Sequence, residues 1–359
     1  MLLLLLACDP LANDSRVQGK TDDTGAPPIA DGCRADPGDP NKDRELLLAL
    51  PYESDGDQTD TWAAWTLSGD GELRTSASRF SMGRATTGQV VYTPDGSVAL
   101  APQSDGTLGV YAEGTVVETA LGDIYAEHIV MDPSGEKAWA IDGNWPDKGG
   151  GIYPLSNPCD SPPVSIGERW LAAKLPAAMI PVGENWLIVG REISGSTRFS
   201  DVVLVDGAGG LLAEADAFGD NEAVVTAAVL SRDGRYLLIS DNSEFSGVPT
   251  RIAVVEVGEN SLIPVQVLDI EDPVGLFVSP DDDRVVVLSG YGDALFVLER
   301  TDNDAAPYVD TGEPTYRGGR PQLPGVGALI ERGALKGLLM LTEVEGVRQV
   351  QIQGGVEDW

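Results

Sequence analysis

From about residue 40 to its end, the chain alternates short apolar segments with polar turns. Four segments share one shape, in which a turn containing Pro, Asp or Gly joins two apolar strands: VVYTPDGSVALAP, HIVMDPSGEKAWAID, AVLSRDGRYLLIS and FVSPDDDRVVVLS. MIPVGENWLIVG and ALIERGALKGLLML fit more loosely, and DPNKDRELLLAL resembles a degenerate first copy. Apolar runs of strand length bounded by turn residues predict β-hairpins.

These hairpins recur at a nearly regular spacing. One turn residue from each gives the series Lys42, Asp95, Ser134, Glu184, Asp233, Asp282 and Gly333. The successive gaps are 53, 39, 50, 49, 49 and 51 residues. Self-similarity with a period of about 40–50 residues is typical of propellers and other repeat folds.

Each hairpin is followed by two further strand-length segments, such as GDALFVLER and SLIPVQVLDI. Because four antiparallel strands make a blade, we predict an all-β fold, a β-propeller of seven blades with four antiparallel strands each. The last unit shows little of a fourth strand, so we expect residues 28 to 34 or 44 to 50 to complete it. Only residues 167 to 175, GERWLAAKL, could be read as a helix.

The turn sequences carry a family resemblance. Ser279-Pro280-Asp281-Asp282 before an apolar strand, and Thr93-Pro94-Asp95-Gly96 before another, resemble the SPDG-type turn of YVTN-type and WD-like propeller repeats. The resemblance covers most of the chain from about residue 40 and implies the fold. Such propellers include enzymes, scaffolds and surface proteins, so it does not imply one function.

The charge of the chain narrows its partners. Aspartate and glutamate total 57 against 24 lysines and arginines, a net charge of −33. Such a field repels phosphate backbones and anionic headgroups, which excludes nucleic acid as a partner. It indicates either a solvated surface suited to an exposed compartment or a surface that attracts cations.

The N-terminus, MLLLLLACDP, resembles the end of a bacterial lipoprotein signal peptide. The resemblance implies that residues 1–8 end in a lipobox and that Cys8 carries the lipid. The apolar run is shorter than the usual 7–15 residues and lacks a basic segment before it. The alternative is an apolar N-terminus on a protein without an anchor.

Residues 9–31 are rich in Asp, Gly, Pro and Thr and poor in bulky apolar residues, so we expect a flexible acidic tether before a propeller at 32–359. With Cys8 assigned to the lipid, Cys33 and Cys159 remain. An even remainder in an exported protein predicts a disulfide between them, and the alternative is two free thiols.

Candidate catalytic residues are few. Lactonase-type propellers use histidine, glutamate and arginine in the central channel, whereas this chain has one histidine, His128, in the apolar segment AEHIVMD. A lone histidine there is more often structural than a general base, so no catalytic residue is assigned. Paired carboxylates could still support glycoside chemistry.

Several acidic loops could hold a metal ion. Asp55, Asp57 and Asp60 stand at relative positions 1, 3 and 6, partly like a calcium loop but without its glycine and closing glutamate. Asp281, Asp282 and Asp283 are a second acidic run. The alternative is a hairpin turn, because Asp side chains bond nearby backbone amides without any metal. No cofactor is expected, and calcium is the ion that these loops could hold.

We interpret the chain as a monomeric cell-envelope propeller, lipid-anchored on the periplasmic or cell-surface side, that binds a protein, peptide or glycan. The alternative is a channel-sited enzyme, a carboxylate-based hydrolase or lyase. Tryptophans such as Trp65, Trp139 and Trp186 would line a sugar-binding face if exposed, and otherwise pack within blades.

The lipid anchor is directly testable. Mass analysis of the mature protein should show processing at Cys8 and a diacylated N-terminal cysteine, and globomycin should block this processing. An unprocessed chain that fractionates without the membrane would contradict the anchor.

Overall fold

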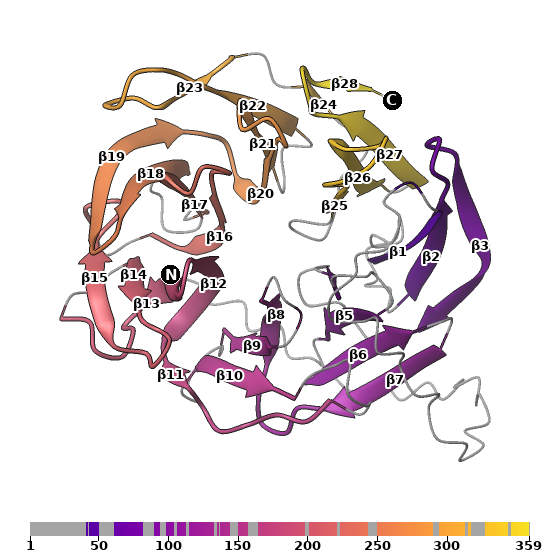
Figure 1. The fold of residues 1–359 in the computed structure, drawn as a ribbon, viewed down its shortest axis with the longest axis horizontal. Coiled ribbons are helices and arrows are strands. Elements are labelled where there is room, and N and C mark those ends of the chain that lie inside the picture. The colour runs from indigo at the N-terminus through magenta and orange to yellow at the C-terminus, as the bar shows by residue number, and fades with distance from the viewer. Residues whose placement is uncertain are drawn as a thin grey trace, which may run out of the picture.

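The computed structural model describes residues 41, 43–49, 61–81, 90–93, 98–103, 106–112, 115–132, 135, 137–143, 150–156, 164–197, 201–220, 223–242, 250–289, 294–312, 315–316, 327–343 and 346–358. In this part of the chain the structure is all β, and antiparallel sheets stand side by side around a common centre (Figure 1). The chain is therefore a β-propeller, as its turn pattern predicts. No helix among the described residues is long and apolar enough to cross a bilayer.

Six sheets are blades with four strands in chain order from the centre outward (Figure 1). The first three contain β4 (Val91–Tyr92), β5 (Val98–Pro102), β6 (Thr107–Ala112) and β7 (Thr115–Ala120); β8 (Ala126–Met131), β9 (Ala138–Asp142), β10 (Gly151–Leu155) and β11 (Leu171–Ala172); and β12 (Lys174–Val182), β13 (Asn185–Arg191), β14 (Val202–Val205) and β15 (Leu211–Ala215).

The next three contain β16 (Val225–Leu230), β17 (Tyr236–Asp241), β18 (Arg251–Gly258) and β19 (Ser261–Asp269); β20 (Pro273–Val278), β21 (Arg284–Ser289), β22 (Ala294–Arg300) and β23 (Tyr308–Asp310), with β24 (Thr315–Tyr316) also paired to β22; and β25 (Gly327–Leu329), β26 (Leu338–Glu343), β27 (Gly346–Gln351) and β28 (Glu357–Asp358).

The expectation of seven four-stranded blades needs correction, because the structure has six such blades and one three-stranded sheet. That sheet comprises β1 (Arg44–Ala49), β2 (Thr61–Leu67) and β3 (Leu73–Ser81). In every other unit the repeated turn joins the first and second strands, whereas the turn at Lys42 precedes β1. By position in the repeat, β1 is therefore a second strand, and the place of a first strand falls before residue 41, outside the described residues.

The expected completion of the last blade by residues 44 to 50 is wrong. Arg44–Ala49 pairs along its whole length with β2, from Arg44 opposite Leu67 to Ala49 opposite Trp62. The last blade instead has a short fourth strand of its own, β28, which pairs with Val350 and Gln351 of β27. Residues 28 to 34 lie outside the described residues.

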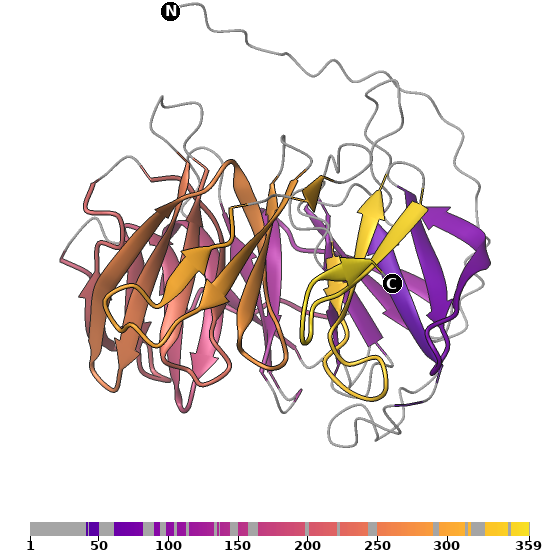
Figure 2. The same cartoon turned by 90° about the horizontal axis from the view of Figure 1, so that it is seen from above.

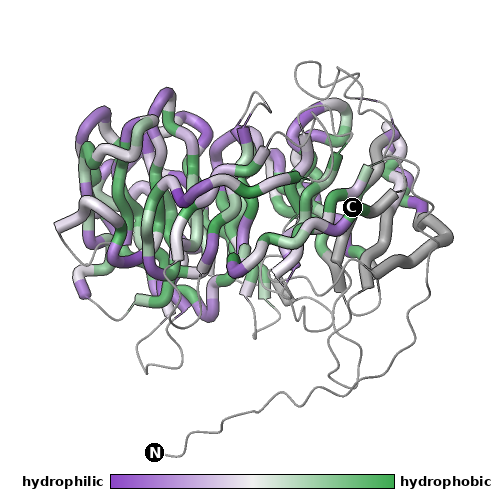
Figure 3. The backbone as a smooth tube through the Cα atoms, turned by 90° about the horizontal axis from the view of Figure 1, so that it is seen from below, coloured by the Kyte–Doolittle hydropathy of each residue, from purple (hydrophilic) through white to green (hydrophobic). Residues whose placement is uncertain are grey.

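The core lies between neighbouring blades. Along β9, Ala138 and Ala140 join a buried cluster shared with the preceding blade, while Trp139 and Ile141 join one shared with the following blade. Strands β17 and β21 divide their side chains between two clusters in the same way. Successive side chains of a strand point to opposite faces, so a sheet buried on both faces needs a continuous apolar run. Figure 3 shows apolar segments along the middle of the strands and polar ones toward the two ends of the ring.

The repeated turns share one hydrogen-bonding scheme. In four of them the residue that opens the turn uses its side-chain oxygen to accept a bond from the backbone N–H five residues later; these residues are Thr93, Asp132, Ser231 and Ser279. The fourth residue of the turn is left-handed, with φ of 72° at Gly135, 74° at Gly234 and 63° at Asp282. Glycine adopts this backbone conformation without steric cost, whereas Asp282 must be held in it.

The two ends of the described chain meet in the ring. Leu46 and Leu67 of the three-stranded sheet pack with Leu338 and Met340 of the last blade in one buried cluster. The Asn41 side chain also accepts a 3.0 Å hydrogen bond from the Ala334 backbone N–H. Among the described residues, the ring is thus closed by side-chain packing and by this hydrogen bond.

Two contributions determine the stability of the turn at Asp282: the bonds of its carboxylate and the left-handed conformation of its backbone. Two substitutions of Asp282 separate them. Asp282→Ala removes its bonds and leaves a side chain in the left-handed region, so we expect a loss of about 2–3 kcal/mol in unfolding free energy. Asp282→Gly removes the same bonds but relieves the backbone, so its loss should be about 1 kcal/mol smaller. Urea unfolding measures both, and equal losses would contradict the role given to the backbone.

Candidate functional site

The ring has two chemically different ends. The end with the repeated turns between first and second strands is called the turn face, and the opposite end, where the inner strands begin, is called the bulge face (Figure 2). The inner strands β8, β12, β16 and β20 all shift register close to their first residue. Such bulges re-aim side chains and are common beside functional sites.

On the turn face, the acidic run Asp281–Asp283 forms a hydrogen-bonded turn. Asp281 accepts a bond from Ser279 Oγ and another, 2.9 Å long, from the Gly354 N–H of the next blade. Asp282 accepts a 2.7 Å bond from the Arg232 N–H of the preceding blade. These carboxylates therefore join three consecutive blades.

Arginines reinforce these contacts between blades. Arg300 pairs with Asp282 of its own blade and with Asp233 of the preceding one, and its guanidinium lies 5.3 Å from the ring centre of Tyr236. Burial alone would raise the pKa of Asp233, but the bonds from Arg300, Ser231 and the Arg235 N–H together outweigh it and lower the pKa to about 2. The Arg232 side chain pairs with Glu331 of the last blade at 2.7 Å. The turn face from β16 to β26 is thus a rigid, charge-paired surface.

On the bulge face, five blades place a polar residue at the end of the second strand or directly after it. These residues are Gln103, Asp142, Arg191, Asp241 and Ser289. Four of them stand directly opposite the first residue of the inner strand, and all but Arg191 are buried. Buried polar groups from several blades therefore surround the bulged inner strands.

Glu127 is the bulge residue of β8. Its carboxyl fills the space over Gly143 where a side chain would begin. Burial, and then the nearby Asp142 carboxylate, raises the pKa of Glu127 to about 7. Its neighbour His128 has a pKa lowered to about 4 by burial, so this imidazole is neutral at pH 7.

A second carboxyl pair lies on the bulge face between the β12–β15 and β16–β19 blades. Asp201 is only 1% exposed and accepts bonds from the Ala217 and Phe218 N–H groups at 2.9 and 3.4 Å. Burial, followed by the charge of Asp216, raises the pKa of Asp201 to about 7. This buried carboxyl holds the connection between the two blades.

The far end of this connection is held by Asp241. It accepts a 2.7 Å bond from the Val224 N–H and pairs with Arg251 at 2.9 Å. Arg251 also pairs with Asp220 at 2.7 Å and lies 4.8 Å from the ring centre of Phe218. Asp201, Asp241 and Arg251 therefore anchor the chain between these two blades.

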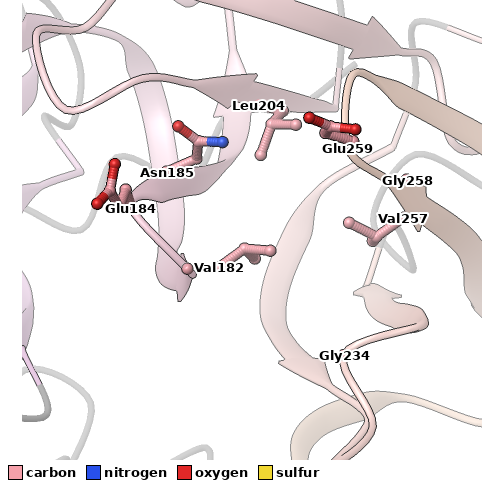
Figure 4. Close-up of a pocket in the computed structure, with 9 residues that line it drawn as sticks. Val182, Glu184, Asn185, Leu204, Gly234, Val257, Gly258 and Glu259 are labelled. Atoms are coloured by element: carbon pink, nitrogen blue, oxygen red, sulfur yellow. The ribbon is translucent and has the colours of Figure 1, made fainter.

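A cleft opens on the turn face between the same two blades (Figure 4). Its volume is about 310 Å³. Glu184 and Asn185 border one side and Glu259 the other, with Val182 and Leu204 between them (Figure 4). Glu184 and Glu259 are exposed, and no ion-pair partner accompanies either within the described residues.

Most residues singled out from the sequence fall elsewhere. Cys8, Cys33 and Cys159, and the calcium candidates Asp55, Asp57 and Asp60, lie outside the described residues, so the lipid, disulfide and calcium assignments stay predictions. Within the described ranges, no three His, Cys, Asp or Glu side chains are arranged to hold a metal ion.

Trp139 and Trp186 pack in the core, which is the alternative to lining a sugar-binding face. Trp139 is buried and meets Trp186 edge to face, with ring centres 4.6 Å apart. Both rings pack in the cluster between two blades. These two side chains are part of the core and do not form a sugar-binding face.

The pattern of apolar segments did not reveal the cleft, although the sequence contains a signal for it. The tetrapeptide Val-Gly-Glu-Asn occurs at 182–185 and again at 257–260. One copy is the β12–β13 turn and the other the β18–β19 turn. Their meeting at one cleft depends on the ring geometry.

The chain matches no known family model and no curated protein sequence. Among solved structures it is similar to a 6-phosphogluconolactonase-like protein from Bacteroides uniformis, with 18% identity, a TM-score of 0.58 and coverage of 77% of this chain and 85% of that one. It is also similar to the Cps50 propeller domain of Myceliophteria thermophila, with 10% identity, a TM-score of 0.54 and coverage of 86% and 96%.

A periplasmic gluconolactonase of Pseudomonas aeruginosa is similar as well, with 16% identity, a TM-score of 0.52 and coverage of 79% of this chain and 84% of that one. At such identities the likeness shows the propeller fold alone. A single fold supports unrelated functions, so function must be argued from the site.

The Asp201 carboxyl predicts a specific dependence of stability on pH. Its folded pKa lies above the ordinary value, so the folded state holds a proton that the unfolded chain releases. This contribution is complete below about pH 4 and is lost as pH rises through 7, about 1 kcal/mol of it between pH 6 and 8.

Asp201→Asn, which mimics the protonated form, should therefore raise the melting temperature at pH 8 but not at pH 5. Asp269→Asn, on the exposed outer strand β19, removes the same charge and serves as the control. A gain for Asp201→Asn that is equal at both pH values would contradict a buried protonated carboxyl.

Proposed function

We propose that this chain is a binding module of the bacterial cell envelope, a propeller held at a membrane by a lipid on Cys8 and spaced from it by residues 9–31. The turn face receives a positively charged segment of a protein or peptide partner. We also propose a ring of seven blades, with β1–β3 as the second to fourth strands of the seventh.

The distribution of charge carries this proposal. Residues 201–312 contain 22 aspartates and glutamates, five arginines and no lysine. All five arginines are already paired with carboxylates: Arg235, Arg251, Arg284 and Arg300 with carboxylates of the same region, and Arg232 with Glu331 of the last blade. The excess carboxylates need cations from outside, which favours a basic partner and repels an acidic one.

The rigidity of the turn face supports the same reading. Its turns are joined across blades by Asp281, Asp282, Arg232 and Arg300. A surface that is ordered before it meets its partner loses little conformational entropy on binding. This favours recognition by a fixed surface over a mobile lid.

A channel-sited enzyme is the second candidate, and one observation favours it. Glu127 and Asp142 form a carboxyl pair on the bulge face in which the pKa of Glu127 is raised to about 7. A protonated acid beside an ionised one is the arrangement used in general acid–base chemistry. This candidate rests on one carboxyl pair, whereas the charge distribution and the cross-blade contacts of the turn face both favour binding, so binding is the better-supported function.

Site-specific photo-crosslinking in the envelope tests the proposed face. The photoreactive residue p-benzoylphenylalanine in place of Asn303, an exposed residue in the β22–β23 loop of the turn face, should yield a discrete cross-linked partner. The same residue in place of Glu271, exposed between β19 and β20 on the bulge face, is the control.

Peptide mapping of the adduct should place the cross-link in a segment rich in lysine or arginine. Cross-linking of equal yield from both faces, or an adduct in an acidic segment, would contradict the proposal.

A further inference from the structure

We infer that the cleft between the β12–β15 and β16–β19 blades binds one arginine or lysine side chain of an extended polypeptide. This inference rests on the proposed binding function and specifies its contact. For clarity it is called the VGEN cleft, after the tetrapeptides at 182–185 and 257–260 that border it.

The two tetrapeptides bring their glutamates to the cleft by different turns. In the first, Val182 pairs with Asn185, so Gly183 and Glu184 form the turn. In the second, Gly258 pairs with Ser261, so Glu259 and Asn260 form the turn. The difference of one residue in register still leaves one carboxylate on each side of the same cleft (Figure 4).

The walls between the two carboxylates are apolar. Leu204 is buried, and Val182 and Val257 pack against the same cluster as Leu204. Gly234 contributes backbone alone, and its left-handed φ of 74° disfavours a side chain there. An apolar floor below two carboxylates suits a side chain with an aliphatic stem and a cationic head.

The size of the cleft points to a side chain rather than to a cofactor. Its volume of about 310 Å³ lies at the small end of the range for ligand pockets, about 300–1,000 Å³. The cleft is open to solvent at the rim, where both glutamates are exposed. A single side chain of a bound polypeptide can therefore enter while its backbone stays on the surface.

The protein's own nearest arginine does not occupy the VGEN cleft. Arg235 follows Gly234 directly, but it pairs with Glu256 and Asp304, each at 3.0 Å. Its guanidinium also lies 4.9 Å from the ring centre of Tyr236. From residue 175 to residue 335 the chain has no lysine. Within the described residues Arg235 is paired elsewhere, so we take the cationic head to come from a bound polypeptide.

The turn that borders the cleft is fixed in place. The Gly234 N–H bonds to the Ser231 carbonyl at 2.9 Å, and the neighbouring Asp233 pairs with Arg300 of the next blade. The cleft is thus ordered by the same cross-blade contacts that make the turn face rigid, which lowers the entropic cost of binding.

A peptide pair tests the VGEN cleft. The full chain is titrated with acetyl-Gly-Val-Arg-Val-Gly-amide and with the same peptide carrying citrulline, which keeps the shape of arginine but not its charge. The arginine peptide should bind about 10-fold more tightly at low salt, and 0.5 M NaCl should remove most of that preference.

Substitutions of the two glutamates test where on the protein the arginine side chain binds. Glu184→Gln and Glu259→Gln should each reduce the preference for arginine about 3-fold, and the double variant should abolish it. Glu118→Gln, on the outer strand β7 of another blade, removes one exposed charge elsewhere and should leave the preference unchanged. All three glutamates are exposed, so we expect the substitutions to leave the melting temperature unchanged. This measurement checks that each variant folds.

The outcomes separate the inference from the proposed function. A preference for arginine that survives in the double variant would overturn the VGEN cleft while leaving the proposed binding function in place. Micromolar Ca²⁺ binding that depends on Glu184 and Glu259, without peptide binding, would overturn the inference in favour of a metal site. Absence of both peptide preference and turn-face cross-linking would overturn both.

Discussion

Packing of one blade against the next is the interaction on which the rest of the structure depends. Each described blade buries both of its faces, so neighbouring residues of one strand join different clusters, as Val286 and Val287 of β21 do. Burying apolar area contributes about 25 cal/mol per Å², and this contribution needs a neighbour on each side. The ring must therefore close, and it does so through Leu46, Leu67 and the last blade.

The two ends of the ring differ in the surroundings of their charged residues. On the turn face, carboxylates and arginines of neighbouring blades lie close enough to pair, and Asp282 stands where related turns have glycine. On the bulge face, burial raises the pKa values of the Asp201 and Glu127 carboxyls. The turn face is thus a surface of ion pairs between blades, whereas the bulge face combines the Asp241–Arg251 ion pair with carboxyls whose pKa values are raised by burial.

Most of the repeat architecture could be read from the chain, and the exceptions have physical reasons. A continuous apolar run implies a strand buried on both faces, so β17 and β21 were expected. Residues 167–175 have a helical period, yet the structure forms β11 and β12 from Leu171 and Lys174 onward. Edge pairing with β10 and inner-strand packing override the weak helical preference there. The prediction that residues 44 to 50 complete the last blade was wrong because β1 follows the first repeated turn instead of preceding it.

The sequence by itself determined the class of fold, the repeat, the position of the turns and the excess of acid, because these depend on local patterns and on composition. Only the tertiary structure decided which acids are neutralised, which are protonated and which face an open cleft. Two Val-Gly-Glu-Asn turns 75 residues apart become neighbours because one lies on the inner hairpin of its blade and the other on the outer hairpin of the next. Proximity across blades is set by the geometry of the ring, and no local pattern of residues encodes it.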